Sequence, residues 1–311
     1  MTMEHHESEH TSPPRTITPL STPAASSVGM LRFPYAHAEL HALVKTALDE
    51  DGAFNDLTTI ATVVSDRHAR GRLVARAQGV LCGIPLAVEA FRTLDPKVTI
   101  RVDCEDGTRI NPGDSILYLS GHARALLAAE RVALNFMQRL SGVASCTARY
   151  VDAVKDTRAK ILDTRKTTPG WRLLEKYAVR AGGGTNHRLN LSTAVLIKDN
   201  HLASVDGDVG LAVRRARDLA PVGTKVEVEC DRIEQVQAAL EAHADIIMLD
   251  NMSTELMKRC VELVAGQAIT EASGGVNLES VRIIAETGVD WISVGAITHS
   301  APALDLALDF E

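Results

Sequence analysis

The sequence predicts an α/β protein in which a small domain with an antiparallel sheet precedes an incomplete barrel of about six parallel strands. Residues 69–120 alternate apolar and polar side chains between turns, as the strands of an antiparallel sheet do. After about residue 155, short apolar segments alternate with amphipathic helical segments, which indicates a parallel sheet. An open, doubly wound sheet is the alternative for this second part, because six strands are fewer than the eight of a closed barrel.

Helices and strands are predicted from the spacing of apolar residues. Residues 35–50 place apolar side chains at helical spacing, and residues 123–140 are rich in Ala and Leu without internal Gly or Pro. We expect a helix in each. Asp231 followed by Glu234 has the pattern of a capping box and predicts Asp231 as the N-cap of a further helix. The expected strands of the second part cover residues 159–163, 193–198, 225–230, 245–250, 268–273 and 290–295.

The first residues of the chain differ in composition from the rest. Residues 1–29 are rich in Ser, Thr, Pro and His and show almost no apolar periodicity, which predicts a disordered tail. His5, His6 and His10 could bind a metal ion, but no Cys or carboxylate pattern completes a site. We therefore expect these histidines to be solvated.

Composition restricts the class of protein. No apolar run approaches the roughly 18 residues of a membrane helix, and the N-terminus lacks the apolar segment of a secretory signal. The five cysteines are scattered and never spaced as CxxC, which argues for reduced thiols and against disulfides or a zinc site. The net charge of −7 argues against a general nucleic-acid binder. We expect a soluble cytoplasmic protein.

One stretch of this acidic chain is basic. Residues 160–199 hold eight lysines and arginines but only three acidic residues, which indicates a pocket for a small anion. The cations fall on predicted loops and strand ends, where parallel α/β folds gather functional groups. Any one of them alone could be an ordinary surface cation, but together they would match carboxylates or phosphates. The set comprises Arg165, Lys166, His187, Arg188 and Lys198.

Carboxylates follow on the next predicted strands. Glu227 and Glu229 are two residues apart on one strand and therefore share a face. Buried acids require a cation, and Mg²⁺ held by one or two carboxylates together with substrate phosphates would fit. Glu229 lies nearer the strand end, and Asp250 ends the next strand and can share the same ion. An ion pair with Lys198 or another base is the alternative.

Glycine turns precede helices after the last two predicted strands. Glycines allow backbone N–H groups to approach a phosphate, and a helix N-terminus adds partial positive charge, whereas the alternative is an ordinary tight turn. A further glycine run, Gly182 to Gly184, predicts a flexible or tightly approaching loop that places His187 and Arg188. The two candidate phosphate turns are Ser273, Gly274 and Gly275, and Gly295, Ala296, Ile297, Thr298 and His299.

Seven segments carry a family resemblance when they are taken in order along the chain. They are ERVALNFMQRLSGVAS, LDTRKTTPGWRLLEKYAVRAGGGTNHR, LIKDNH, VEVEC, MLDN, EASGG and VGAITHSAPALDLALDF. Together they resemble quinolinate phosphoribosyltransferase, the carboxylating nicotinate-nucleotide pyrophosphorylase, over residues from about 35 to 310. The resemblance implies an N-terminal α/β sandwich at residues 30–136, a catalytic α/β barrel at residues 137–299, and a C-terminal helix at residues 300–311 that returns to the sandwich.

The same resemblance implies a reaction. Members of this family convert quinolinate and phosphoribosyl pyrophosphate into nicotinate mononucleotide, pyrophosphate and CO₂ with Mg²⁺, at the entry to de novo NAD biosynthesis. We expect sugar transfer before decarboxylation and no organic cofactor. Two subunits would pack head to tail as a homodimer with shared active sites, and a higher assembly is compatible with this. Nucleic acid and membrane are not expected partners.

The resemblance also implies residue roles. Residues that hold quinolinate would be Arg131, which enters the partner's site, and Thr164, Arg165, His187, Arg188 and Lys198. Residues that bind phosphoribosyl pyrophosphate would be Lys166, Glu229, Asp250, Ser273, Gly274, Gly275, Gly295, Ala296 and His299. Glu229 and Asp250 would hold Mg²⁺ directly or indirectly. The catalytic residues would be Lys166, Lys198, Glu229 and Asp250.

Three other functions compete with this one. A phosphoribosyltransferase for another pyridine or pyrimidine acid is the nearest, but nicotinate offers one carboxylate and the surplus of cations favours two. A relative of the same fold associated with molybdenum transport would lack the set Arg165, His187 and Arg188. A non-catalytic anion-binding or scaffold protein would have no need of Glu229 and Asp250.

Overall fold

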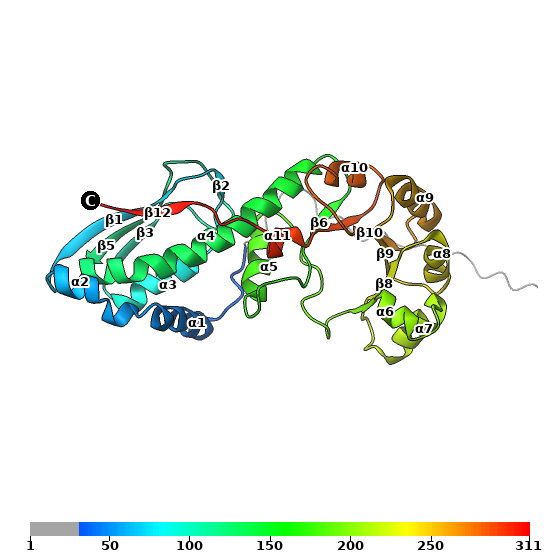
Figure 1. Ribbon diagram of the computed structural model, residues 1–311, viewed down its shortest axis with the longest axis horizontal. Coiled ribbons are helices and arrows are strands. Elements are labelled where there is room, and N and C mark those ends of the chain that lie inside the picture. The colour runs from blue at the N-terminus through cyan, green and yellow to red at the C-terminus, as the bar shows by residue number, and fades with distance from the viewer. Residues whose placement is uncertain (1–30) are drawn as a thin grey trace, which may run out of the picture. The chain divides into compact units, whose positions relative to one another are not determined.

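The computed structural model describes residues 31–311 (Figure 1). The predicted disordered tail, residues 1–29, lies outside the described residues. No helix within residues 31–311 has the length and apolar character that crossing a membrane requires.

An antiparallel sheet of four strands forms the first part of the fold, as the alternating pattern predicts. Its order is β12-β1-β5-β3, with β1 at His68–Ala75, β3 at Thr99–Val102 and β5 at Ser115–His122. In β5 the buried side chains alternate with partly exposed ones along much of the strand, because successive residues of a strand point to opposite faces of the sheet. The short elements of this part are η1 (Ala53–Asn55), α2 (Leu57–Thr62), β2 (Gly79–Val80) and β4 (Arg109–Ile110).

Three helices pack together in this part. The predicted helix at residues 35–50 is α1, His37–Glu50, which buries Leu40, Val44 and Leu48. These positions recur at helical spacing and form one apolar face. The helix α3, Ile84–Leu94, contacts both α1 and α4, so an apolar core forms among these three helices.

The helix α4 runs from Ala123 to Ala153 and is longer than the predicted helix at residues 123–140. Beyond residue 140 it passes Gly142, where a Cβ atom would lie 2.1 Å from the carbonyl oxygen of Pro302. Glycine, a poor helix former, is therefore retained for close contact with another segment, and packing outweighs propensity. The predicted domain boundary between residues 136 and 137 falls inside this continuous helix.

Six parallel strands form the second sheet, in the order β6-β11-β10-β9-β8-β7. Strands β6 and β7 are the two edges, so the sheet does not close into a full barrel. Consecutive helices α7, α8, α9 and α10 contact one another along the sheet (Figure 1), as the outer helices of a barrel do. The strands are β6 (Lys160–Leu162), β7 (Val195–Ile197), β8 (Val226–Cys230), β9 (Ile246–Asp250), β10 (Ile269–Ser273) and β11 (Trp291–Ser293).

One predicted helix start is wrong. The helix α8 begins at Ile233 with Arg232 at the N-cap and no side-chain cap, and the backbone N–H of Asp231 bonds to the side chain of Gln235 instead. The carboxylate of Asp231 pairs with Arg232, so it does not cap the helix. The helices of this part are α5 (Arg172–Ala181), α6 (Asp199–Ala203), α7 (Val209–Leu219), α8 (Ile233–Glu241), α9 (Thr254–Val264), α10 (Val281–Ala285) and α11 (Ala296–His299).

The expected C-terminal helix at residues 300–311 is also wrong. Residues Leu306–Phe310 form strand β12, which pairs antiparallel with β1 and places Leu308 opposite Leu73. The segment LALDF is apolar except for Asp309, so its own sequence does not separate a strand from a helix. As a strand it covers an edge of β1 that would otherwise leave backbone groups unpaired. The chain end does return to the first sheet, but as a strand.

Candidate active site

A cavity of about 330 Å³ opens at the carboxyl ends of the parallel strands. Most of the predicted cations line it, so the topology brings together residues that are far apart in sequence. Among the predicted quinolinate ligands, Arg131 is the exception, because it lies exposed on α4 and does not line this cavity. The lining residues are Thr164, Arg165, Lys166, His187, Arg188, Leu196, Lys198, Met248, Ser273 and Ser293.

The loop that carries Arg165 and Lys166 is fixed from both sides. The fully buried Glu175 accepts hydrogen bonds from the backbone N–H of Thr168 at 3.1 Å and from its hydroxyl at 2.9 Å. Arg139 from α4 pairs with the same carboxylate at 2.6 Å. On the other side, the hydroxyl of Thr298 donates to the carbonyl of Lys166 at 2.8 Å. Arg139 and Glu175 were not predicted as site residues, because in the sequence both resemble ordinary polar residues of amphipathic helices.

Arg165 and Arg188 both line the cavity, and neither forms an ion pair with an acidic residue within the described range 31–311. Within residues 31–311, the buried Nε of Arg165 has no hydrogen-bond partner. Burial lowers the pKa of Arg188 and the charge of Arg165 lowers it further, while the charge of Glu227 partly opposes this shift. Arg188 is held in place by a 3.1 Å hydrogen bond from its Nη1 to the carbonyl of Ala194. Like charges in a half-buried place are unfavourable unless an anion joins them, so the pair has the character of an anion site.

The glycine run before His187 packs tightly, which decides between the two predicted alternatives. A Cβ atom on Gly182 would lie 2.3 Å from the carbonyl oxygen of Ala144, and one on Gly184 would lie 2.7 Å from the side chain of Thr147. Only glycine allows this approach of the loop to α4.

A buried ion pair fixes the next residues of that loop. Lys176 lies 2.5 Å from Asp163 and donates to the carbonyl of His187 at 3.0 Å. Asp163 in turn accepts from the backbone N–H of His187 at 2.8 Å and from the amide of Asn186 at 2.7 Å. Burial raises the pKa of Asp163 and lowers that of Lys176, while the ion pair opposes both shifts. The buried pair Asp163 and Lys176 thus fixes the backbone that bears His187 and Arg188.

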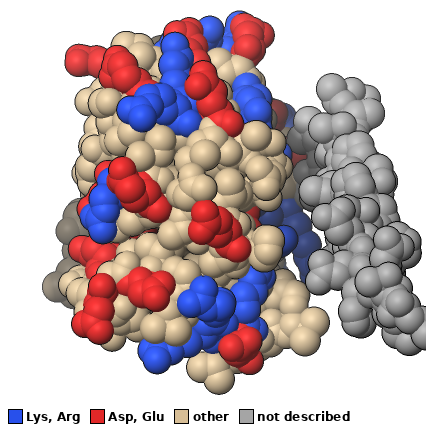
Figure 2. Space-filling model, turned by 90° about the vertical axis from the view of Figure 1, so that its right-hand side faces the viewer, with Lys and Arg blue, Asp and Glu red and all other residues tan. Residues whose placement is uncertain are grey.

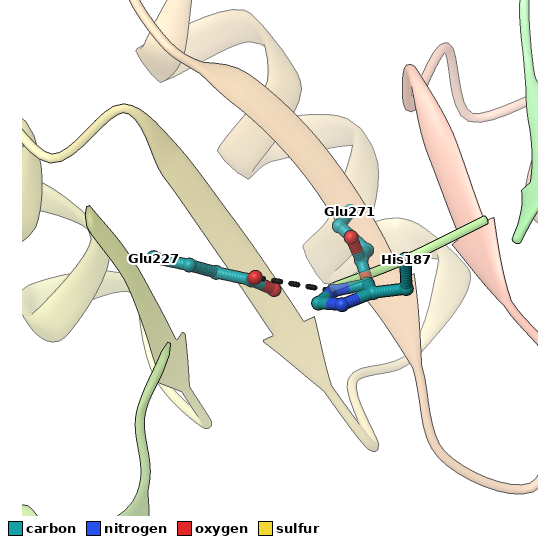
Figure 3. Close-up of side chains that lie close together, drawn as sticks. All are labelled: His187, Glu227 and Glu271. Carbon is teal, nitrogen blue, oxygen red and sulfur yellow. Dashed lines mark ion pairs between the residues drawn. The ribbon is translucent and has the colours of Figure 1, made fainter. Parts of the chain in front are cut away.

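His187 faces two buried glutamates (Figure 3). Its Nε2 lies 3.1 Å from Glu227 on β8 and 3.5 Å from Glu271 on β10. Burial alone lowers the pKa of His187, but the two carboxylates outweigh it and raise the pKa to about 10. Burial raises the pKa of Glu227, which His187 partly offsets. Glu271 was missed from sequence, although its spacing of two from Ser273 places it on the same face of β10.

Glu229 is paired with Lys198, the alternative weighed above. The two side chains meet at 2.5 Å, and Asp250 accepts from the amide of Asn251 at 2.6 Å. Neither Glu229 nor Asp250 lines the cavity described above. They end the neighbouring strands β8 and β9, so their oxygens could complete a Mg²⁺ site together with substrate phosphates. In the described part of the chain, the one group of three side chains able to hold a metal is His187, Glu227 and Glu271.

Both glycine turns predicted to bind phosphate are tightly packed. Gly274 has a φ of 95°, and a Cβ atom there would lie 2.2 Å from the side-chain oxygen of Asn251, so a larger residue is excluded. Ser273 lies opposite Asp250 in the strand register. A Cβ atom on Gly295 would lie 3.2 Å from the side chains of both Lys166 and His299, so these three predicted phosphate ligands lie together. Ala296 and Gly275 follow within the same turns.

Charge on the outer surface is distributed differently from charge in the cavity. On the face drawn in Figure 2, acidic and basic side chains are interspersed with uncharged ones. Of the eight lysines and arginines in residues 160–199, four line the cavity: Arg165, Lys166, Arg188 and Lys198.

The chain matches two domains of one family. The N-terminal domain of quinolinate phosphoribosyl transferase matches residues 56–141, and its C-terminal domain matches residues 143–309. The nicotinate-nucleotide pyrophosphorylase (carboxylating) of Mycobacterium leprae is 44% identical over 274 residues, which are 86% of this chain and 95% of the relative. A probable enzyme of the same name from Bacillus subtilis is 41% identical over 273 residues, 88% of this chain and 94% of the relative.

Solved structures agree with these matches. The nicotinate-nucleotide pyrophosphorylase from Francisella tularensis superposes with a TM-score of 0.84 at 39% identity, over 90% of this chain and 98% of that chain. NadC from Streptococcus pyogenes gives 0.85 at 42% identity, over 89% of this chain and 99% of that chain. The two family models together cover most of the chain, and the relatives match over nearly their whole length. The chain therefore belongs to the quinolinate phosphoribosyl transferase family.

Proposed function

We propose that this protein transfers the phosphoribosyl group of phosphoribosyl pyrophosphate to quinolinate with decarboxylation, which gives nicotinate mononucleotide, pyrophosphate and CO₂ for NAD biosynthesis. The observation that carries this proposal is the pair Arg165 and Arg188. Two guanidinium groups without an acidic partner in residues 31–311 line one cavity. Each can form two parallel hydrogen bonds with one carboxylate, and quinolinate carries two adjacent carboxylates.

The residues of the cavity perform positioning and charge stabilisation. With both carboxylates held, the ring nitrogen of quinolinate is kept in line with the anomeric carbon of the ribose, which is where the new bond forms. Positive charge develops on the ribose as the pyrophosphate leaves with its electron pair. Lys166 lies beside Gly295 and His299 and would stabilise the departing phosphates.

Sugar transfer precedes loss of CO₂ in this scheme. The ribosylated ring nitrogen is cationic and can accept the electron pair that remains when the adjacent carbon–carboxylate bond breaks. A proton then replaces the carboxylate on that carbon. No organic cofactor is required, because the substrate itself supplies the electron sink.

Mg²⁺ is part of the proposal. When bound, it neutralises charge on the leaving pyrophosphate. Glu229 and Asp250, at the ends of adjacent strands, would provide its protein oxygens alongside those of the substrate. Glu229 would then exchange its contact with Lys198 for one with the ion or the ribose hydroxyls.

A homodimer is also part of the proposal. Arg131 is exposed on α4 and lies outside the cavity of its own chain, which suits a residue that serves the site of a partner. We also propose that the enzyme is soluble and cytoplasmic.

One assay tests the proposed function. Purified protein is incubated with phosphoribosyl pyrophosphate and Mg²⁺, and either quinolinate or nicotinate is added. We expect nicotinate mononucleotide and an equal amount of CO₂ from quinolinate alone. Product from nicotinate without CO₂ would assign the protein to the monocarboxylate enzymes. Binding of quinolinate without any product would favour a non-catalytic anion-binding protein.

A further inference from the structure

Asn251 adopts a backbone conformation that is rare for residues with a side chain. Its φ is 52°, in the left-handed region, which Asn adopts more easily than most residues because its short amide can bond locally. It directly follows β9, at the carboxyl end of the parallel sheet, where the predicted ligands of phosphoribosyl pyrophosphate lie. A rare conformation at such a place indicates a role beyond turning the chain.

The side chain of Asn251 lies between two of these predicted ligands. Its Nδ2 donates a hydrogen bond of 2.6 Å to the carboxylate of Asp250. Its Oδ1 lies only 2.2 Å from the position that a Cβ atom on Gly274 would take. One amide thus contacts both the carboxylate predicted to face the ribose and Mg²⁺ and the turn predicted to hold the phosphate.

The backbone of Asn251 joins the same two strand ends. Its N–H donates to the carbonyl of Ser273 at 3.0 Å, one step beyond the pair Asp250 and Ser273 of the strand register. Gly274 is also left-handed, with a φ of 95°, and only glycine leaves room there for the amide of Asn251. The ends of β9 and β10 therefore pack around one side chain.

The carboxylate of Asp250 has no other side-chain partner to orient it. In the described part of the chain no basic residue pairs with it, and the amide of Asn251 is its one hydrogen-bond donor. Hydrogen bonds to an ionised carboxylate are roughly twice as strong as those between neutral groups. The amide therefore determines the direction in which this carboxylate points.

We propose that Asn251 is a positioning residue for phosphoribosyl pyrophosphate. It turns the carboxylate of Asp250 toward the ribose hydroxyls and Mg²⁺, and it fixes the place of that carboxylate relative to the phosphate turn at Gly274. Asn251 acts through these two groups and does not itself bind the substrate. This inference rests on the proposed function for the identity of the ligand.

The first test, Asn251→Gly, separates the side chain from the backbone. Glycine adopts a positive φ without strain, so the turn is retained while the amide is lost. We expect the KM for phosphoribosyl pyrophosphate to rise roughly five- to tenfold, while the KM for quinolinate and the Tm stay close to those of the wild type. An unchanged KM for phosphoribosyl pyrophosphate would overturn the inference.

Two further variants at this position separate the amide from the conformation. Alanine lacks the amide and is strained at a positive φ, so Asn251→Ala should share the KM of Asn251→Gly but have a lower Tm. In Asn251→Asp the side chain has the same size but cannot donate to Asp250, so we expect no recovery of the KM. If Asn251→Ala alone is impaired, the backbone conformation is what matters and the inference is wrong. A wild-type KM in Asn251→Asp would also contradict it, because the donor would not be needed.

The matched control is His243→Gly. His243 is exposed and has a positive φ of 59°, but it precedes β9 whereas Asn251 follows it. The same substitution there should change neither KM. A rise in the KM for phosphoribosyl pyrophosphate as large as that in Asn251→Gly would mean that glycine acts by loosening the strand, which would refute the positioning role.

Binding without turnover separates this inference from the proposed function. Calorimetric titration with phosphoribosyl pyrophosphate and Mg²⁺, without quinolinate, should give a higher Kd in Asn251→Gly than in the wild type. Equal Kd values would overturn the positioning role even if quinolinate is turned over. If the wild type makes no product from quinolinate while this Kd still depends on Asn251, the proposed function fails and the positioning role stands.

Discussion

Replacing Arg165 with alanine isolates the interaction on which we propose that quinolinate binding depends. Arg165 is half-buried, lines the cavity and leaves its Nε without a hydrogen-bond partner in the part of the chain that the structure describes. No acidic residue there forms an ion pair with it. Its polar atoms are therefore available to a ligand, and the Ala substitution removes a charge-assisted contact without breaking one inside the protein.

The size of the effect follows from that geometry. A hydrogen bond to a charged group contributes about 1.5–3 kcal/mol, and each 1.4 kcal/mol is tenfold in affinity. We expect the Kd for quinolinate to rise roughly tenfold to one-hundred-fold in Arg165→Ala. The free protein should not lose stability, because the substitution also removes the repulsion that lowers the pKa of Arg188.

Two measurements check this pair of expectations. Calorimetric titration gives the Kd for quinolinate and for phosphoribosyl pyrophosphate, and thermal unfolding gives the Tm of the free protein. The control is Arg259→Ala, which removes an exposed arginine from α9 and should change neither Kd. Equal weakening of both ligands would refute the role given to Arg165. A large fall in Tm would show that the side chain holds the fold and not the substrate.

Further predictions concern the shared site, the metal and the pH dependence of stability. Mixing Arg131→Ala subunits with Lys198→Ala subunits should restore part of the activity, and absence of recovery would count against a shared site. Chelation of Mg²⁺, or Glu229→Gln, should abolish or strongly reduce turnover while quinolinate still binds in titration; unchanged turnover would contradict the roles proposed for Mg²⁺ and for Glu229. Burial raises the pKa of Asp106, despite its hydrogen bond from Tyr177. The folded protein thus holds this proton more tightly than the unfolded chain, and the free energy of unfolding should fall as pH rises above about 4. Asp106→Asn should lack this part of the fall in urea titrations, and a pH profile identical to the wild type would disprove the assignment.

The order of elements was predictable because local patterns determine it. The six parallel strands were found from short apolar segments, and each observed strand lies inside its predicted range. Features set by distant contacts were not predictable. The helix α4 continues past residue 140 through Gly142, which packs against Pro302, and residues 306–310 form a strand that pairs with the edge of β1. Neither partner is near in sequence.

The candidate site shows the same division. The predicted strand ends identified the cations of the site correctly. The pairing of each cation with a particular carboxylate was not predictable, because it depends on the direction in which each side chain points. Glu229 was chosen as a metal ligand and pairs with Lys198, whereas Glu227 faces His187. Glu271 could have been found, because residues two apart on β10 share a face and Ser273 was already a candidate. Arg139 gives no such signal, since its partner Glu175 becomes a neighbour only when α4 and α5 pack.

Some cations of the cavity face acidic side chains and others do not, and this difference explains why the cavity suits a dianion. Lys198 is paired with Glu229, and His187 faces Glu227 and Glu271. Lys166 lies with Gly295 and His299 on the side predicted to bind phosphate. Of the cations that this chain contributes to its own cavity, Arg165 and Arg188 then remain for the ring substrate, and neither forms an ion pair in residues 31–311. A monocarboxylate would leave one of two adjacent guanidinium groups uncompensated, and that repulsion would select against it. Under the proposed function, selectivity for quinolinate would therefore follow from which cations the protein leaves unpaired, and not from their total number.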